Sequence, residues 1–275
     1  MNRYLGAAQY QQARTHTVRT AGSTPGRPGL VTVGVDDSPD SYVALDHAAV
    51  EADVHGWDLR LVHVQRAISG ADRDSGAELL RRLTDRVHAQ SQRVTVHSRL
   101  AIGPPASTLL GAVQDADLVV VGRRHGAAGA MLGMTVGDSV AAHHRGPVLI
   151  VRVPGWPPGP DFARRPLAAV TDGSPLGERA AAFAMAEARV RGCGLVLLHS
   201  SPAAVAGDYV ETVDGVEVHH RCTRRDPAGA LISASQEAAA VVAGRQNHGG
   251  VAETLLGSVS RAVVEHAPCP VFLIG

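Results

Sequence analysis

The chain reads AVVAGRQNHGGVAETLLGS from Ala240 to Ser258. An apolar run at 240–243 comes first, a glycine-rich loop at 244–250 follows, and Leu255 and Leu256 open a helical pattern. Proteins of the α/β class hold phosphate with this order of buried strand, loop and helix, because N–H groups of the helix's first turn converge on the anion. Glycines let the ligand approach the backbone. The stretch predicts a nucleotide site in an α/β fold.

The same order of elements occurs earlier in the chain, so the sequence contains an internal repeat. An apolar run at 118–121 precedes a loop and then a helical pattern. Near the start of each copy the offset is 136 positions, the separation of Asp36 and Asp172. At the glycine loop it has fallen to 122, the separation of Gly122 and Gly244. The second copy has therefore lost residues in its middle.

Strand-like and helix-like patterns alternate in both copies. In the first copy, strands are predicted at 30–35, 59–64, 94–100, 118–121 and 148–153, and helices near 41, at 78–90, at 106–113 and after 135. Alternation of this kind predicts a mostly parallel sheet with helices on both faces. We expect an α/β fold of two tandem doubly wound domains, each with a parallel five-stranded sheet of the flavodoxin or Rossmann type.

The expected boundaries follow from composition. Residues 1–28 are predicted to be a disordered tail, 29–153 the first domain, 154–165 a Pro/Gly-rich linker and 166–275 the second domain. The second copy repeats the first strand at 167–170, a helix at 178–189 and a strand at 195–199. No convincing helix occurs between Ser200 and Gly215, so the second domain is expected to be shortened, with its second helix missing.

Composition excludes several functions. The formal net charge is zero, which gives no electrostatic reason to expect nucleic acid or a membrane as a partner. All 26 basic residues are Arg, so chemistry that depends on a Lys, such as a Walker A loop or a Schiff base, is excluded. Three cysteines without pair or metal spacing predict neither disulfides nor zinc. We expect a cytoplasmic protein with no metal centre.

Candidate ligand-binding residues cluster where strands end. In doubly wound sheets, ligands lie beyond the carboxyl ends of the strands. The candidates in the first copy are Asp36, Asp37, Val64, Gly122, Gly126, Gly133, Thr135 and Val136. Those in the second copy are Asp172, Gly173, Ser200, Gly244, Asn247, Gly257, Ser258, Val259 and Ser260. No catalytic residue is predicted, because no nucleophile with a positioned base is apparent.

These motifs resemble the universal stress protein family in its tandem two-domain form. The most specific are LLGSVS at 255–260 and HAPCPV at 266–271, together with LVHV on the second strand. The resemblance covers nearly everything from Leu30 onward. It implies that Asp36 and Asp172 accept hydrogen bonds from a nucleoside, and that Val64 and Ser200 border an adenine. It also implies that Thr135 and Ser258 bind phosphate.

Family members that bind ATP carry Gly, two residues, Gly, nine residues, then Gly and Ser or Thr. The second copy keeps this spacing with Asn247 in place of the middle Gly, and Asn tolerates a left-handed backbone. The first copy keeps Gly122 but has His125 at the next position, Gly126 after it, and a loop one residue shorter. We expect the second phosphate subsite to be the better one.

The resemblance implies an adenine-nucleotide-binding regulator of a stress or dormancy response, with ATP, with or without Mg²⁺, as the ligand. Slow ATP hydrolysis and a non-binding scaffold with degenerate sites are the alternatives. Asp36, Asp172 and Ser258 also have a structural interpretation as helix N-caps. Family domains pair through their last strands, here 148–153 and 271–274, so we expect either a homodimer or a domain pair within one chain.

Overall fold

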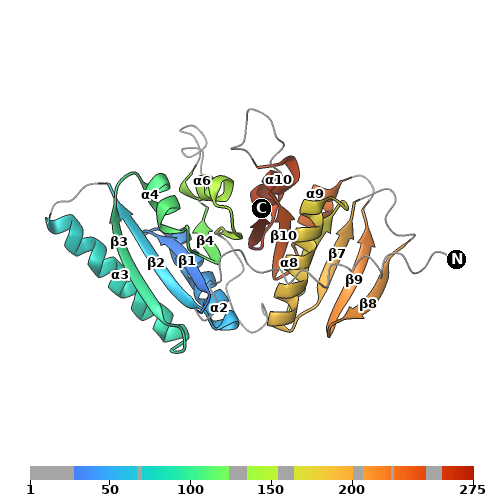
Figure 1. Ribbon diagram of the computed structural model, residues 1–275, viewed down its shortest axis with the longest axis horizontal. Coiled ribbons are helices and arrows are strands. Elements are labelled where there is room, and N and C mark those ends of the chain that lie inside the picture. Colours follow the sequence, from blue (N-terminus) through green and yellow to red (C-terminus); the bar gives the residue numbers. More distant parts are fainter. Residues whose placement is uncertain are drawn as a thin grey trace.

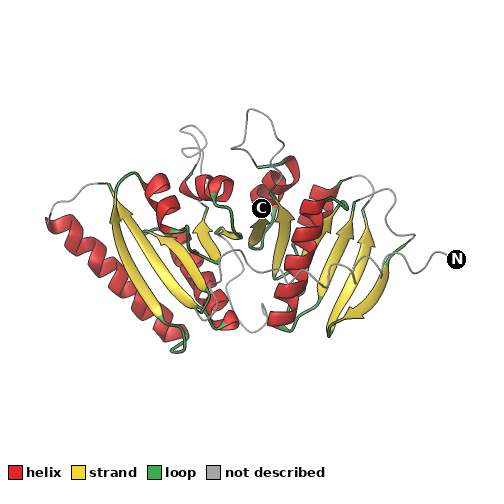
Figure 2. Ribbon diagram, viewed as in Figure 1, coloured by secondary structure: helices red, strands yellow, loops and turns green. Residues whose placement is uncertain are grey.

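The computed structural model describes residues 28–66, 70–123, 135–153, 164–200, 207–223, 226–245 and 256–275. These residues form eleven strands and seven helices (Figure 1, Figure 2). Helices cover both faces of one mostly parallel sheet, as the alternating sequence pattern predicts. Within the described part of the chain, no helix combines the length and apolarity needed to cross a bilayer.

The first half of the chain forms five parallel strands. In chain order its elements are β1 (Leu30–Val35), α2 (Pro39–His55), β2 (Asp58–Gln65), α3 (Gly70–Gln90), β3 (Val96–Ile102), α4 (Pro105–Ala112), β4 (Leu118–Gly122), α6 (Val136–His143) and β5 (Val148–Val151). The strands lie in the order β3-β2-β1-β4-β5. The order reverses between β1 and β4, so the carboxyl ends of these two strands flank the topological switch point.

The second half repeats this order and adds one strand. Its elements are β6 (Leu167–Thr171), α8 (Pro175–Arg191), β7 (Leu195–His199), β8 (Tyr209–Val213), β9 (Val216–Cys222), α9 (Pro227–Ala234), β10 (Ala240–Gly244), α10 (Ser258–His266) and β11 (Val271–Ile274). The strands lie in the order β11-β10-β6-β7-β9-β8. The described residues between β7 and β9 form the extra edge strand β8, which pairs antiparallel with β9.

The two halves share a single sheet. Their last strands, β5 and β11, pair antiparallel, with Leu149 opposite Phe272. The family resemblance implies a pairing of terminal strands and leaves open whether one chain supplies both; the structure pairs them within the chain. Two mirrored strand orders joined by an antiparallel pair place a pseudo-two-fold axis between β5 and β11.

Arginines tie the halves together on either side of this pair. Arg245, just after β10, donates hydrogen bonds to Ala141 O (2.8 Å) and Gly146 O (2.6 Å) at the end of α6. Arg152, just after β5, donates to Val264 O (3.4 Å) at the end of α10. A cation at a helix C-terminus complements the helix dipole. Each half thus caps a helix of the other.

Matched sequence positions explain why the first helix of each half has the same limits. Ser38 and Ser174 are the N-caps of α2 and α8, and each is followed by a proline at the first helical position. At the other end, Gly56 and Gly192 adopt left-handed conformations with φ of 64° and 63°. The repeat in the sequence is therefore a repeat of helix start and stop signals.

The core consists of two apolar layers, one on each face of the sheet. Helices α2, α3 and α8 cover one layer, which contains Leu45, Leu83 and Phe272. Helices α4, α6, α9 and α10 cover the other, which contains Leu231 and Val263. Small and aliphatic side chains dominate both layers, as expected from a composition with 3% aromatic residues. This packing holds the strand ends at fixed positions.

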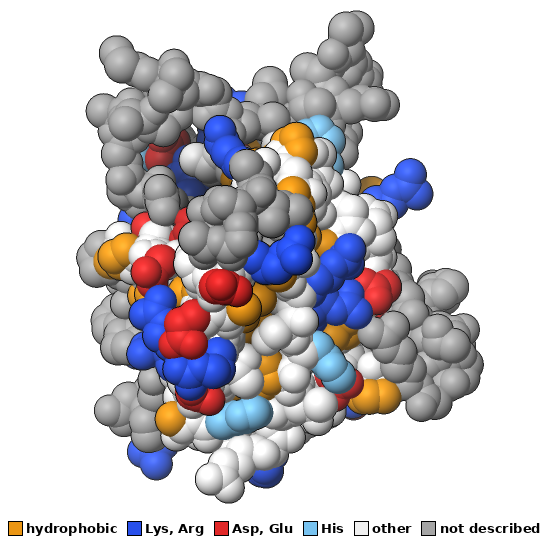
Figure 3. All heavy atoms as spheres, turned by 90° about the vertical axis from the view of Figure 1, so that its left-hand side faces the viewer, with side chains coloured by type: hydrophobic (Ala, Val, Ile, Leu, Met, Phe, Trp, Pro, Cys, Tyr) orange, Lys and Arg blue, Asp and Glu red, His pale blue; other side chains and the backbone are white. Residues whose placement is uncertain are grey.

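Helix α3 is longer than its apolar pattern predicts. It begins at Gly70 rather than near 78, and its outer face is polar. Arg81 bridges Glu78 (2.7 Å) and Asp85 (2.8 Å), and Arg86 bonds Asp46 of α2. Figure 3 shows acidic and basic side chains next to one another on this end of the molecule. Such exposed pairs each contribute little to stability.

A buried charge cluster lies where α2 meets α8. It contains Glu51 and His55 of α2 and Glu187 and Arg191 of α8, which we call the interhelix cluster. Arg191 bonds both carboxylates, at 3.2 Å in the case of Glu187, and His55 Nε2 lies 3.2 Å from Glu187 Oε2. The repeat offset of 136 relates Glu51 to Glu187 and His55 to Arg191. The cluster therefore straddles the pseudo-two-fold axis.

Candidate functional site

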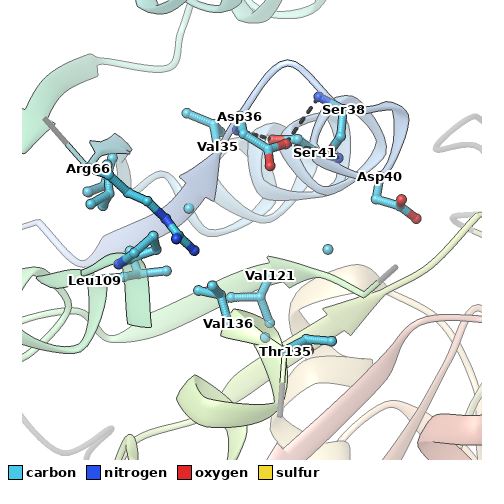
Figure 4. A pocket seen from close by; sticks show the side chains of 16 residues that line it. Val35, Asp36, Ser38, Asp40, Ser41, Arg66, Leu109, Val121, Thr135 and Val136 are labelled. Atoms are coloured by element: carbon cyan, nitrogen blue, oxygen red, sulfur yellow. Dashed lines mark hydrogen bonds between the residues drawn. The ribbon is translucent and has the colours of Figure 1, made fainter. Parts of the chain in front are cut away.

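A cavity of about 380 Å³ opens at the switch point of the first half (Figure 4). It lies at the carboxyl ends of β1, β2 and β4, between α4 and the N-terminus of α6. Its lining residues are Gly34, Val35, Asp36, Ser38, Asp40, Ser41, Val62, Val64, Arg66, Pro105, Leu109, Val121, Gly122, Thr135, Val136 and Gly137. Ligands of doubly wound sheets bind in this position.

Five residues predicted from the sequence meet in this cavity: Asp36, Val64, Gly122, Thr135 and Val136. They come from three strand ends and one helix start, which are far apart in the chain. The topology of the sheet is what brings them together. Gly126 and Gly133 lie outside the described residues.

Gly122 is required by a close approach of two backbones. A Cβ atom built at this position would lie 2.8 Å from the carbonyl oxygen of Asp40, in the first turn of α2. No side chain fits there without moving the main chain, because real Cβ atoms do not approach an oxygen so closely. The glycine therefore lets the start of α2 and the end of β4 close the wall of the cavity.

The Asp36 carboxylate holds the turn between β1 and α2. Its Oδ1 accepts hydrogen bonds from the backbone N–H of Ser38 (3.1 Å) and from the Ser38 hydroxyl. Ser38, not Asp36, is the N-cap of α2, since its Oγ accepts from Ser41 N. The N-cap interpretation of Asp36 is therefore wrong. The side chain lies at the rim of the cavity, as Figure 4 shows.

The wall opposite Asp36 is mostly apolar. Val62 and Val64 of β2, Leu109 of α4 and Val121 of β4 provide it. Arg66, just after β2, extends its exposed side chain into the cavity from that side (Figure 4). An apolar slot with a few polar groups at its edges is typical of sites for small planar ligands.

The N-terminus of α6 forms the floor. Thr135 is its N-cap: its Oγ1 accepts from Asp138 N at 3.1 Å. In return, Asp138 Oδ2 accepts from Thr135 N (3.2 Å) and from Thr135 Oγ1 (2.8 Å). This reciprocal arrangement is a capping box. Asp138 Oδ1 also accepts from Arg123 Nε at 3.2 Å. The helix start that faces the cavity thus already holds a carboxylate.

Asp37 does not line the cavity. Its carboxylate accepts a hydrogen bond from Tyr42 Oη at 2.7 Å and lies 3.4 Å from Arg82 of α3. The bond from Tyr42, together with the nearby guanidinium of Arg82, lowers the pKa of Asp37. Its observed contacts are with α2 and α3.

In the second half, Asp172 repeats the conformation of Asp36. Its Oδ1 accepts from Ser174 N at 2.9 Å, and hydrogen bonding by the Ser174 side chain, followed by that of the Ser174 backbone, lowers the pKa of Asp172. The N-cap of α8 is Ser174, so the N-cap interpretation of Asp172 is also wrong. Gly173 between them has a φ of 79°, and Ser200 N donates to Thr171 O at 2.9 Å. The exposed Asp172 carboxylate stands at the end of β6.

The start of α10 differs from the start of α6. Gly257 is its N-cap, and no side chain caps the helix. Ser258 is the first helical residue, so its interpretation as an N-cap is wrong. Val259 packs on the core, while Ser260 is buried and donates its hydroxyl to Gly257 O at 3.0 Å. Among the residues that the structure describes, no side chain accepts from the backbone donors of this helix start.

The loop of the second half, from 246 to 255, lies outside the described residues, and so does Asn247. The preceding Gly244 packs under Leu176 of α8, whose Cγ would lie 2.6 Å from an added Cβ. Leu176 occupies the position that Asp40 has in the first half, at the repeat offset of 136. The two halves therefore differ in polarity at this point.

Sequence reasoning missed Arg66, Leu109 and Asp40. Arg66 follows a predicted strand directly, which is a signal that could have singled it out. The orientation of Leu109 depends on how α4 packs against β2, and that cannot be taken from the sequence. Asp40 enters the site because α2 approaches Gly122.

Three potential metal ligands do meet in the structure, away from the cavity. The ligand atoms of Glu51, His55 and Glu187 lie within 4.8 Å of one another in the interhelix cluster. The guanidinium of Arg191 already bonds both carboxylates. We infer that Arg191 neutralises these carboxylates, since a metal ion would have to displace its guanidinium.

Comparisons with known proteins agree on one family. Residues 30–152 and 203–275 match the model of the Universal stress protein family. A universal stress protein of Mycolicibacterium smegmatis is 30% identical over 89% of this chain and 96% of its own length. One from Mycobacterium tuberculosis strain H37Rv is 30% identical over 88% of this chain and 95% of its own.

A solved structure gives the same result for the fold. The crystal structure of a universal stress protein from Archaeoglobus fulgidus superposes with a TM-score of 0.71. It covers 89% of this chain and 97% of its own, at 19% sequence identity. The two folds are therefore similar over nearly the full length of both chains, including both halves of this one.

Proposed function

The chain belongs to the universal stress protein family, and on that premise we propose that it binds an adenine nucleotide and regulates a stress or dormancy response. The binding would take place at the carboxyl edge of the sheet. One observation carries this proposal: five of the residues that the sequence and the family resemblance predict for a nucleotide line the cavity at the switch point.

The lining residues divide into parts that suit a nucleoside. The apolar slot between Val62, Val64 and Leu109 fits a planar base. The Asp36 carboxylate at the rim is an acceptor for ribose hydroxyls. Thr135 at the start of α6 and Arg66, which reaches in from the side of the apolar wall, are the groups that we assign to a phosphate. Arg is well suited to that contact, because its planar group donates several hydrogen bonds.

The second half is proposed to hold a triphosphate. Its sequence keeps the family spacing from Gly244 to Ser258, and the start of α10 has no side-chain cap. Asp172 is ionised at neutral pH, since its pKa is lowered, and its carboxylate can accept from a ribose. We propose ATP, with or without Mg²⁺, as the ligand of this half.

We propose binding rather than catalysis. A ligand that binds two conformations of a protein unequally shifts their populations, and no chemical step is needed for a signal. Slow ATP hydrolysis is the alternative from the enzyme class, with Mg²⁺ and a water oriented by Asp172 or Asp36. A scaffold that binds no nucleotide is the other. We also propose a cytoplasmic location.

Isothermal titration calorimetry with adenosine, AMP and ATP tests the proposal. Wild-type protein should release or absorb heat that saturates, and native mass spectrometry should show the nucleotide bound to the chain. Val64→Trp fills the base slot and should remove the signal of the first half. Val190→Trp, on an exposed position of α8, is the matched control and should bind as the wild type does.

The alternatives give different results. No heat and no thermal shift with any nucleotide at millimolar concentration would favour the scaffold and contradict our proposal. Phosphate release from ATP that disappears in Gly257→Val would favour the hydrolase. Release that persists in that variant would indicate a contaminating enzyme.

Self-association beyond one chain is a separate proposal. The pairing of β5 with β11 already uses the terminal strands of both halves. A homodimer would therefore need another surface. Light scattering distinguishes the two states, and a mass of one chain at micromolar concentration would contradict the dimer.

A further inference from the structure

We propose that the first-half cavity selects an adenine nucleoside carrying at most one phosphate over a triphosphate, and that Asp138 sets this selectivity. The inference rests on the proposed function, since it concerns which nucleotide enters the same cavity. Asp138 is not itself a lining residue. It acts through Thr135 and the first turn of α6, which do line the cavity.

Two donors at the start of α6 that a polyphosphate would use are already occupied. Asp138 Oδ2 accepts from Thr135 N at 3.2 Å and from Thr135 Oγ1 at 2.8 Å. A backbone N–H and a hydroxyl at a helix start are the groups that usually bind phosphate oxygens. A phosphate would have to displace the carboxylate to reach them.

The charge of Asp138 acts in the same direction. A carboxylate at a helix N-terminus is stabilised by the positive end of the helix dipole, which is the attraction that would otherwise hold the phosphate. Arg123 is engaged as well, because its Nε lies 3.2 Å from Asp138 Oδ1. Both side chains are about three-quarters buried, so solvent screens their interactions only in part.

The second half has the opposite arrangement at the matched position. Arg261 lies 123 positions after Asp138, as Ser258 lies 123 positions after Thr135. Helix α10 therefore carries a cation where α6 carries an acid, and no side chain caps its start. The contrast between the halves therefore lies in the first turn of the helix that follows the loop.

The rest of the cavity also favours a ligand of low charge. Asp36 and Asp40 add two carboxylates to its rim, while Arg66 is the one cation among the described residues that line it. One guanidinium can balance a single phosphate, whereas the four negative charges of ATP would meet two acids. The volume of about 380 Å³ is near the lower end of the range of roughly 300–1,000 Å³ for small-molecule sites.

Calorimetric titration of the full-length protein with adenosine, AMP and ATP measures the selectivity. Binding to the first half is identified as the heat that Val64→Trp removes. In the wild type, we expect ATP to bind there at least about tenfold more weakly than AMP, because like charges repel strongly at such short range. Asp138→Asn should strengthen ATP binding by at least about tenfold and change adenosine binding by less than about threefold.

Two further variants separate charge from capping. Asp138→Arg copies the residue of the second half and should favour ATP more than Asp138→Asn does. Asp85→Asn, an equally conservative change on the exposed face of α3, is the control and should leave every affinity unchanged. Retained adenosine binding shows that each variant is folded.

The outcomes for function and selectivity are distinct. If the wild type binds none of the three ligands, the proposed function fails and the selectivity falls with it. If adenosine and AMP bind but ATP binds the first half equally well, the selectivity is overturned while the function stands. It is likewise overturned if ATP affinity is the same in Asp138→Asn and in the wild type.

Discussion

Removal of Arg191 is expected to destabilise the protein strongly. Its guanidinium bonds the carboxylates of Glu51 and Glu187, and all three side chains are less than 10% exposed. Arg191→Met keeps the aliphatic volume but leaves two buried acids with His55 as their neighbour. Loss of one partner of a buried ion pair costs about 3–5 kcal/mol, because the remaining charge is uncompensated.

Urea unfolding measures this loss. The signals are far-ultraviolet circular dichroism and the fluorescence of Trp57, whose ring stacks on His55 at 4.3 Å. For a slope of about 3 kcal/mol per molar urea, the midpoint of Arg191→Met should fall by roughly 1–2 M. Adding Glu51→Gln and Glu187→Gln to Arg191→Met should recover most of the loss, because the buried charges are then gone.

The pH dependence provides a second test. In the wild type, burial raises the pKa of Glu187, but His55 and Arg191 outweigh burial and lower it below 4.5. Because this pKa is lowered, the ionised carboxylate stabilises the folded state above pH 4.5. That stabilisation is lost as the pH falls further. In Arg191→Met the loss should be largest near pH 7 and shrink towards pH 4. A loss under about 1 kcal/mol at pH 7, or no recovery in the triple variant, would refute the reasoning.

Four other substitutions are expected to change the stability measured by urea unfolding. Gly122→Ala should cost about 1–3 kcal/mol, because its Cβ would lie 2.8 Å from a main-chain oxygen, whereas Gly111→Ala, with open space around it, should gain about 0.5–1 kcal/mol; equal effects would contradict this. Ser174→Ala should cost about 1 kcal/mol through loss of the α8 cap. Burial, and then Arg245, lower the pKa of His144 from 6.5 to about 4. As the pH falls from 6.5, the unfolded chain binds that proton before the folded chain does. The free energy of unfolding therefore falls by up to about 3 kcal/mol between pH 6.5 and 4. His144→Leu should reduce this dependence on pH.

Local signals in the sequence were sufficient for much of the fold. The buried strands are apolar runs, and the serine, proline and glycine positions that begin and end α2 and α8 recur at a constant offset. Those features depend on neighbours in the chain, so they can be taken from the sequence. The start of α3 could not be predicted, because residues 70–77 are glycines, alanines and polar residues and have no helical pattern of large apolar residues.

The hairpin of β8 and β9 was missed although its signal is present. Asp214 and Gly215 stand between alternating apolar residues, and a tight two-residue turn favours this pair. Both residues have positive φ, 51° and 84°, as such a turn requires. The spacing from Thr135 to Asp138 is likewise a readable capping-box signal. The position of Arg66 in the cavity, by contrast, depends on tertiary packing.

The antiparallel pair of β5 and β11 affects how the two halves can evolve. In a symmetric homodimer, any substitution appears on both sides of the axis at once. Here the partners are covalently joined and unlike, so a change in one leaves the other intact. Asp138 of the first half corresponds to Arg261 of the second, and α3 corresponds to β8. A symmetric homodimer of one domain could carry neither difference.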